Sequence, residues 1–280
     1  MFVVQSYDKK CNVPNVFVIF VPTMSLITAF GNMLRGLLRY CVVCHRPVRT
    51  HHFSICPHCV ARLPFVHYRG AVGNPMERLL WSNAYDIGRA QALLLHRAPS
   101  VTTIFVRHFK HHEERALLTQ LTRMAVAELR DTDFFATIDA VVPVPLSRER
   151  QRQRGYNQAA VIAETVARET GLPCLPDLLQ RVVDNPSLSA EHVADRVAGV
   201  AGIFRAAPEG EAYRHILLVD DTITTGATLR ECAHTMADAH TRIHTFSFLT
   251  LFVASGLHVG YGRAEVTSNE DELIRSKPTP

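Results

Sequence analysis

The sequence lacks several features that would assign a class of protein at once. Its charge is nearly balanced, with 30 Lys and Arg against 26 Asp and Glu and a net charge of +4, an excess too small to drive nucleic-acid binding by itself. It contains no internal repeat and no low-complexity block, and 47% hydrophobic residues exclude wholesale disorder. The 280 residues therefore allow one large domain, or a small module and one domain of ordinary size.

Cysteine is sparse outside one segment. Four of the seven cysteines lie between residues 41 and 59, and the others are Cys11, Cys174 and Cys232. A secreted disulfide scaffold is usually shorter and more evenly supplied with cysteine, and an odd total leaves one thiol unpaired. The pattern therefore predicts a reducing compartment, and we expect a cytoplasmic protein.

Charge is absent from residues 11–34, which on pattern alone fits a signal sequence or a marginal membrane span. Several Pro, Asn and Thr residues dilute the apolar run, so we expect no membrane span. Met24 lies inside the run, and translation starts either at Met1 or there. In the second case residues 25–39 form an amphipathic lead-in helix.

Helical and strand patterns alternate in the second half of the chain. Apolar residues at three- and four-residue spacing predict two helices, 113–129 and 157–170, the second ended by Gly171. Apolar and β-branched runs predict three strands, 138–144, 216–219 and 243–253. Residues 71–100 are ambiguous, and residues 184–202 predict a long loop or lid. This alternation predicts an α/β fold with a parallel sheet, whose ligands bind at the carboxyl ends of the strands.

The apolar run Ile216–Val219 is followed directly by two carboxylates, Asp220 and Asp221. In a continuing strand one of them would point into the core, which is costly for an unpaired carboxylate. We therefore expect the strand to end at Val219 and to release both carboxylates into a cleft.

A loop of three threonines, Gly226, Ala227 and Thr228 then leads into a helix. Backbone N–H groups, hydroxyls and the positive end of a helix dipole suit an anion, and glycine permits its close approach. The carboxylates suit sugar hydroxyls or a cation, so a sugar phosphate satisfies both parts. The alternative is an ordinary strand–loop–helix in which the aspartates cap the helix.

Two Cys-x-x-Cys pairs stand eleven residues apart, Cys41/Cys44 and Cys56/Cys59. Zinc prefers four thiolate or imidazole ligands in a tetrahedron, and this spacing supplies four thiolates, which predicts a closed structural site. Three alternatives remain: an iron–sulfur cluster, a redox-active dithiol, and substitution of one cysteine by a nearby histidine. The nearby histidines are His45, His51, His52 and His58.

Four arginines follow at two-residue intervals before the helix predicted at 157, namely Arg148, Arg150, Arg152 and Arg154. Arginine forms planar bidentate contacts with phosphate. The run is also compatible with a solvated surface, or with nucleic-acid binding, although Tyr156, which follows it, is the one aromatic residue nearby in sequence.

The segment 216–228 resembles the phosphoribosyl diphosphate (PRPP) binding motif of type I phosphoribosyltransferases. From about Cys41 to Val253 the chain further resembles the ComF family of phosphoribosyltransferase-like proteins, which is linked to DNA uptake. The shared features are the four-cysteine module, Phe109-Lys110, the Val-Pro-Val-Pro stretch at residues 142–145, Arg154-Gly155-Tyr156-Asn157-Gln158 and the PRPP motif.

The resemblance implies a division of the chain and of its site. The expected parts are a leader or lead-in helix (1–35), a zinc-ribbon-like module (36–70), a phosphoribosyltransferase-like domain (71–255) and a flexible tail (256–280). Asp220 and Asp221 would hold the ribose hydroxyls. The 5-phosphate would lie on Thr224, Thr225, Gly226, Ala227 and Thr228. The expected pyrophosphate contacts are Lys110, Arg154 and Arg196.

As an enzyme, the protein would transfer a phosphoribosyl group from PRPP to a nitrogen acceptor with Mg²⁺, placing it among the glycosyltransferases. The sequence does not name the acceptor or the oligomeric state. The lid departs from the family pattern at Leu188, Glu191, His192 and Gly199, which puts catalysis in doubt. The alternative is a non-catalytic protein that binds PRPP or a nucleotide and contacts single-stranded DNA or a protein of the competence machinery.

Overall fold

The computed structural model describes residues 4–7, 14–17, 39–48, 54–111, 115–183 and 202–257. The chain divides into two compact units, residues 1–39 and 40–280. In the first unit, β1 (Val4–Tyr7) and β2 (Pro14–Phe17) form an antiparallel pair. Residues 25–38 of the predicted lead-in helix and the tail after residue 257 lie outside the described residues. Among the described helices, none has the length and apolar character needed to cross a membrane.

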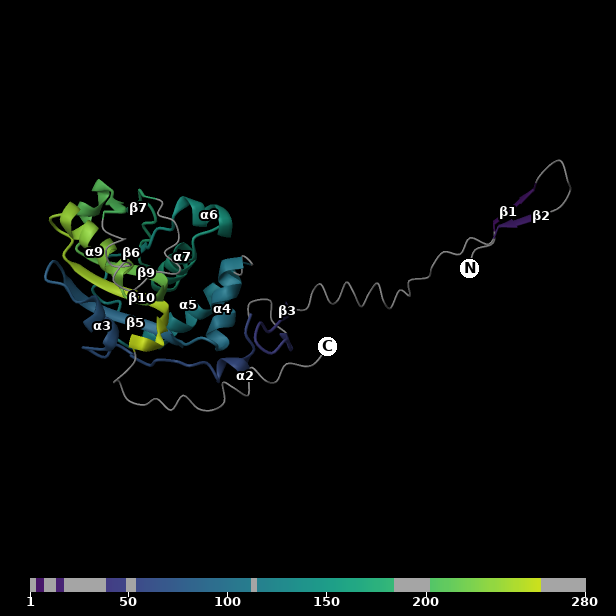
Figure 1. The fold of residues 1–280 in the computed structure, drawn as a ribbon, viewed down its shortest axis with the longest axis horizontal. Helices are drawn as coiled ribbons and strands as arrows, with labels where there is room; N and C mark the ends of the chain where they lie inside the picture. The colour runs from purple at the N-terminus through teal and green to yellow at the C-terminus, as the bar shows by residue number, and fades with distance from the viewer. Residues whose placement is uncertain are drawn as a thin grey trace. The chain divides into compact units, whose positions relative to one another are not determined.

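The second unit is built on a four-stranded parallel sheet with the strand order β5-β10-β9-β6 (Figure 1). Its strands are β5 (Asp86–His96), β6 (Ala140–Pro143), β9 (His215–Ile223) and β10 (Thr245–Ala254). The α/β prediction is confirmed, and β6, β9 and β10 fall on the three predicted strands. Strand β5 lies in the ambiguous stretch, where Arg89, Gln91 and a run of three leucines obscure the two-residue period.

Helices cover both faces of this sheet. One face carries α4 (Val101–His111), α5 (Arg115–Leu129) and α7 (Gln158–Thr170), and the other carries α3 (Pro75–Leu80) and α9 (Ala227–Ala239). In β9, Leu217 and Val219 point to the first face, whereas Ile216 and Leu218 point to the second. A strand buried on both faces has no polar positions, which explains its uninterrupted apolar sequence. The predicted helices 113–129 and 157–170 are confirmed over their described residues as α5 and α7.

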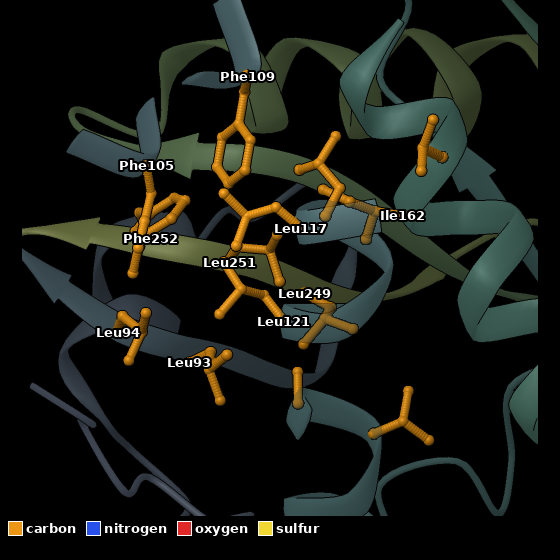
Figure 2. Close-up of a cluster of buried hydrophobic side chains, with 14 of the residues drawn as sticks. Leu93, Leu94, Phe105, Phe109, Leu117, Leu121, Ile162, Leu249, Leu251 and Phe252 are labelled. Carbon is orange, nitrogen blue, oxygen red and sulfur yellow. The ribbon is translucent and has the colours of Figure 1, made fainter. Parts of the chain in front are cut away.

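Aromatic side chains fix α4 to the sheet near the carboxyl end of β10. The fully buried ring of Phe252 lies 5.8 Å from the Phe109 ring and 6.2 Å from the His96 ring, centroid to centroid. Figure 2 shows Phe105 and Phe109 of α4 above the side chains of Leu251 and Phe252. The last turn of α4 is thereby held at the edge where ligands of a parallel sheet bind.

The cysteine segment shares this core. It consists of β3 (Arg39–Tyr40), β4 (Pro47–Val48) and the single turn α2 (Pro57–Val60). Its buried residues Val43 and Ile55 belong to the same hydrophobic cluster as Leu117 and Leu121 of α5. The module predicted at residues 36–70 therefore has no separate core of its own among the described residues.

The arginine run precedes α7, as expected, and it is itself a helix, which was not predicted from the sequence. Helix α6 (Arg148–Arg154) begins at Ser147, whose Oγ accepts a 3.2 Å hydrogen bond from the N–H of Arg150. It ends at Gly155, which adopts a left-handed φ of 76°. The alternating arginines are consequently divided between two sides of one helix instead of lining an extended strand.

A second antiparallel pair, β7 (Leu179–Arg181) and β8 (Phe204–Ala206), flanks the predicted lid. Residues 184–201 of that lid lie outside the described residues, and with them Arg196 and the four departures at 188, 191, 192 and 199. Two short 3₁₀ helices complete the described fold, Pro208–Ala212 and Ser255–Leu257.

Candidate functional site

The two carboxylates lie within strand β9, so the prediction that the strand ends at Val219 is wrong. Strand β6 pairs with β9 only as far as Val219, but β10 continues beside it, with Asp220 opposite Thr250 and Thr222 opposite Phe252. Burial of the Asp220 carboxylate does not end the strand; it increases the affinity of the carboxylate for a proton.

Burial raises the pKa of the Asp220 carboxyl well above its usual range, and the neighbouring Asp221 charge raises it further. The N–H of Asp221, which donates to Asp220 Oδ1 over 2.7 Å, and the charges of Arg154 and Arg150 act in the opposite direction. Burial raises the pKa of the Cys232 thiol on α9, and the nearby charge of Asp220 raises it further. Asp220 therefore lies on the α9 side of the sheet.

The loop after β9 brings helix N–H groups to the same place. Gly226 is the N-cap of α9 and adopts a left-handed φ of 73°. A Cβ atom there would lie 3.0 Å from Leu79 Cδ2 and 3.2 Å from Leu80 Cδ2, so glycine is required by backbone shape and by space. Because glycine has no side chain to cap the helix, the N–H groups of the first turn remain suited to an anion.

A small hollow opens at this point, and it is lined by Asp220 and by every residue from Thr222 to Leu229. The residues predicted to bind phosphate, Thr224 to Thr228, thus lie together with one of the two predicted ribose ligands. The alternative in which the aspartates cap the helix is wrong, because both belong to β9 and the N-cap is Gly226.

Helix α6 presents two of its four arginines to the carboxylates. Arg150 and Arg154 are one turn apart, partly buried, and both affect the pKa of Asp220. Burial lowers the pKa of Arg154, and the charge of Asp221 opposes that change. Arg148 and Arg152 are exposed. The surface interpretation of the run therefore suits only the outer pair.

The residues after α6 connect three elements. The Tyr156 hydroxyl and Gln158 Nε2 each donate a 3.0 Å hydrogen bond to the carbonyl oxygen of Phe109, near the end of α4. Gln158 Oε1 accepts from Arg154 Nη1, also over 3.0 Å. Asn157 caps α7 and donates to the Val144 carbonyl at the end of β6. The sequence identified this motif by resemblance, but it gave no separate role to Tyr156, Asn157 or Gln158.

The structure leaves two predicted pyrophosphate contacts undescribed. The backbone of Lys110 belongs to the last turn of α4, next to the carbonyl that Tyr156 and Gln158 hold, but its side chain lies outside the described residues. Arg196 also lies outside them. Of the predicted contacts, the structure therefore brings Arg154 to the two aspartates, and it adds Arg150, whose spacing within the arginine run was the available signal.

The four predicted metal ligands converge. Their sulfur atoms all lie within 4.8 Å of one another, and Cys44 Sγ is 3.7 Å from Cys56 Sγ. A tetrahedral ion with metal–sulfur bonds of about 2.3 Å places its ligands about 3.8 Å apart. The described cysteines form no disulfide, and His45 and His58 are exposed. The cluster can therefore hold one metal ion with four thiolates.

The thiols differ in their electrostatic surroundings. Burial raises the pKa of Cys59, and the neighbouring sulfurs raise it further. Burial also acts to raise the pKa of Cys41, but hydrogen bonds from the backbone of Cys44, Cys56 and Val43 outweigh it and lower that pKa. Several thiolates this close together need a cation to offset their repulsion, which is what a metal ion supplies.

A buried glutamine of α5 supports the cysteine segment. Gln120 Oε1 accepts hydrogen bonds from the N–H groups of Ser54 (2.8 Å) and Ile55 (3.1 Å), and its Nε2 donates to the Ile55 carbonyl. These bonds fix the chain immediately before Cys56. Nothing in the sequence distinguishes this glutamine from any other polar helix residue, so sequence reasoning missed it.

A larger groove of about 630 Å³ runs between β8 and α9 and is separate from the hollow at the end of β9. Its charged lining is mixed, with Arg205 and His234 as well as Glu231 and Asp238. Unlike the hollow, it does not include the N-cap of α9.

The fold and the two sites define an α/β protein with a parallel sheet, an anion-suited turn after a central strand, and a four-cysteine metal module. No family model matches the chain. It is 29% identical over 207 residues to Competence protein F of Haemophilus influenzae, covering 72% of this chain and 85% of that protein.

Two further relatives agree with this match. The chain is 27% identical over 202 residues to the DNA utilization protein YhgH of Escherichia coli (strain K12), covering 69% of this chain and 82% of that protein. It is 31% identical over 115 residues to Competence protein ComFC of Bacillus subtilis, covering 38% and 45%. These relatives, at 27–31% identity, support the resemblance of the chain to the ComF family.

We expect Asp220→Asn to stabilise the ligand-free protein at neutral pH. A carboxyl whose pKa is raised by folding contributes most stability below its unfolded pKa of about 3.9, and that contribution is lost as the pH rises toward the folded pKa. The asparagine removes this loss and can still accept from the N–H of Asp221. Urea unfolding should show a gain of about 0.5–2 kcal/mol at pH 7 that shrinks toward pH 4.

The matched control is Asp238→Asn, which changes an exposed aspartate on α9. It should alter the unfolding free energy far less at either pH. A loss of stability in Asp220→Asn at pH 7 would contradict the raised pKa.

We expect one zinc ion per chain by elemental analysis. Cys59→Ser should lower the zinc content and the thermal stability together, because the closed site loses a ligand.

Gln120→Ala should retain zinc but release it faster to a chelator, since two buried N–H groups lose their acceptor at roughly 1–3 kcal/mol each. Cys174→Ser and Gln153→Ala, which lie outside the cluster, serve as controls. Equal zinc content in Cys59→Ser and wild type would exclude the site.

Proposed function

We propose that the protein binds PRPP at the turn from Asp220 to Thr228 and transfers its phosphoribosyl group to a nitrogen acceptor. The observation that carries this proposal is the junction of β9 and α9. There, two adjacent carboxylates lie beside a loop whose N-cap is a glycine in the left-handed conformation. Carboxylates suit neutral hydroxyls and the helix end suits a phosphate, so a phosphorylated ribose satisfies both.

Each part of PRPP then has a partner. Asp220 and Asp221 accept hydrogen bonds from the ribose 2- and 3-hydroxyls. The N–H groups and hydroxyls of residues 224–228 bind the 5-phosphate. Arg154 contacts the pyrophosphate, together with Lys110 and Arg196. The raised pKa of Asp220 supports the first assignment, because hydroxyl donors or a cation would replace hydration that this carboxylate has lost.

In the reaction, the bond between C1 of the ribose and the pyrophosphate oxygen breaks, and the leaving group keeps the electron pair. A bond forms between C1 and the acceptor nitrogen, which gives up a proton to solvent or to the departing pyrophosphate. The transition state resembles an oxocarbenium ion, so the residues chiefly orient the reactants and stabilise charge. Mg²⁺ bound with PRPP would neutralise the pyrophosphate, and Asp220 and Asp221 are the carboxylates of this site that could hold it. The reaction needs no strong general base, and we assign none.

We propose that the four-cysteine cluster holds structural zinc. All four positions are thiolates, which leaves no open coordination site for a substrate. Gln120 favours a structural role, because its hydrogen bonds hold the chain immediately before the ligand Cys56. Since thiolate sites require reduced cysteines, the cytoplasm is the compartment we propose.

A second candidate function follows from the names of the relatives, Competence protein F and DNA utilization protein YhgH. In it, the protein binds PRPP or a nucleotide without catalysis and contacts single-stranded DNA, or a protein partner, during DNA uptake. The exposed arginines of α6, Arg148 and Arg152, favour this candidate because they point away from the carboxylates.

PRPP with Mg²⁺ should raise the thermal stability of the wild type, and the double variant Asp220→Asn/Asp221→Asn should lose this rise. A ligand at one hundred times its dissociation constant adds about 2.7 kcal/mol. Because Asp220→Asn is itself expected to stabilise the protein, each variant is compared with its own ligand-free baseline.

Asp238→Asn is again the control and should retain the full rise. A rise lost only in the double variant would justify a screen of nitrogen acceptors for pyrophosphate release. A zinc-loaded, folded wild type that gains nothing from PRPP contradicts the proposed function.

If the second candidate holds, affinity for single-stranded DNA should fall linearly with the logarithm of salt concentration. The slope should weaken by about 0.7 for each phosphate contact removed, so Arg148→Gln/Arg152→Gln should reduce it by about 1.4. Fluorescence anisotropy with a labelled oligonucleotide measures this slope. Glu149→Gln in the same helix is the control, and no binding at low salt rejects the candidate.

A further inference from the structure

We infer that Gln158 is a positioning residue that holds the Arg154 guanidinium in place for the pyrophosphate of PRPP. The inference rests on the proposed function and deepens it, because it identifies what orients the cation of that site. Gln158 is 2% exposed and lies in the first turn of α7, with one partner on α6 and another on α4.

The amide of Gln158 can be oriented in only one way. Its partner on α6 is a guanidinium, which only donates hydrogen bonds, and its partner on α4 is the Phe109 carbonyl, which only accepts them. Oε1 must therefore face Arg154 Nη1 and Nε2 must face Phe109, each at 3.0 Å. A side chain fixed by opposite requirements at its two ends has little freedom to rotate.

Because Gln158 is fixed, its hydrogen bond restricts the guanidinium of Arg154 as well. A free arginine loses up to about 2 kcal/mol of rotamer entropy when it is immobilised, and a ligand must otherwise supply that amount. The bond to Gln158 uses one of the five N–H donors of the guanidinium, so a bidentate contact with a phosphate remains available. Gln158 thus orients the group before the ligand arrives.

The neutrality of Gln158 is also significant. Arg154 lies within the electrostatic influence of Asp220 and Asp221, which attract it toward the ribose side of the site. A neutral amide opposes that movement without neutralising the guanidinium, whereas a carboxylate at position 158 would pair with the charge. An acceptor that is uncharged and buried therefore suits a cation reserved for an anionic ligand.

The second arm of Gln158 connects the same point to α4. The Phe109 carbonyl, which Tyr156 also holds, belongs to one of the last residues of that helix and cannot be fully satisfied within it. Tyr156→Phe would remove one bond to this carbonyl and leave the bond between Gln158 and Arg154 unchanged. It therefore separates support of α4 from orientation of Arg154.

The test is titration calorimetry with Mg²⁺ and three ligands: PRPP, pyrophosphate and ribose 5-phosphate. Gln158→Met keeps the shape of the side chain and removes both hydrogen bonds. We expect affinity for PRPP and pyrophosphate to fall about 3–10-fold, which is the size of the net contribution of one ordinary hydrogen bond. Affinity for ribose 5-phosphate, which lacks the pyrophosphate, should stay within about twofold, and Tyr156→Phe should leave all three within about twofold.

The decisive comparison is a double-mutant cycle with Arg154→Ala. If Gln158 acts through Arg154, Gln158→Met should have no further effect on PRPP affinity once the arginine is absent. A merely structural role would lower affinity equally in both backgrounds. Far-UV circular dichroism and thermal unfolding establish that each variant is folded.

The outcomes separate the two proposals. Equal losses for PRPP and ribose 5-phosphate in Gln158→Met, or additive effects in the cycle, would overturn the positioning role while PRPP binding by the wild type stands. A wild type that binds none of the three ligands would overturn the proposed function and the positioning role with it.

Discussion

The partly buried carboxylate of Asp220 is the constraint on which the candidate site depends. Its strand has already paired with β10 when Asp220 is reached, so the backbone cannot turn away and the side chain must be accommodated. The surroundings meet this demand incompletely: an N–H from Asp221 and the charges on α6 oppose the effect of burial, but the pKa remains raised. A ligand offering hydroxyl groups or a cation would supply the remaining hydrogen bonds or charge that the Asp220 carboxylate lacks in the protein alone. The cost of burying this carboxylate destabilises the ligand-free protein, and ligand binding relieves that cost.

The sequence predicted the parallel sheet, the helices α5 and α7, and the convergence of the four cysteines, because each has a strong local signal. A four-residue error arises at the end of β9, because the cost of burying a carboxylate was judged sufficient to end the strand at Val219 instead of Ile223. That argument omitted the continuing partner strand β10, which no local pattern reveals. Strand β5 was missed for a related reason, since its register is fixed by β10, which follows it by about 150 residues.

Long-range hydrogen bonds were also beyond prediction. Gln120 reaches a segment 65 residues earlier, and Gln158 reaches the end of a helix 49 residues earlier. Buried glutamines gain specificity from such partners, but they carry no periodicity or spacing that points to them. By contrast, the PRPP turn is contiguous in sequence, so its residues were recognisable although the exact end of the strand was not.

The shared core of the cysteine segment determines how this protein can be divided. Val43, Ile55 and Leu63 lie in one buried cluster with Leu117 and Leu121, and no boundary at residue 70 separates them. A chain cut there would leave apolar surface on both pieces, a liability for aggregation. The cysteine segment and the sheet are thus parts of one folding unit. A chimera that takes the sheet from this protein must also take the cysteine segment.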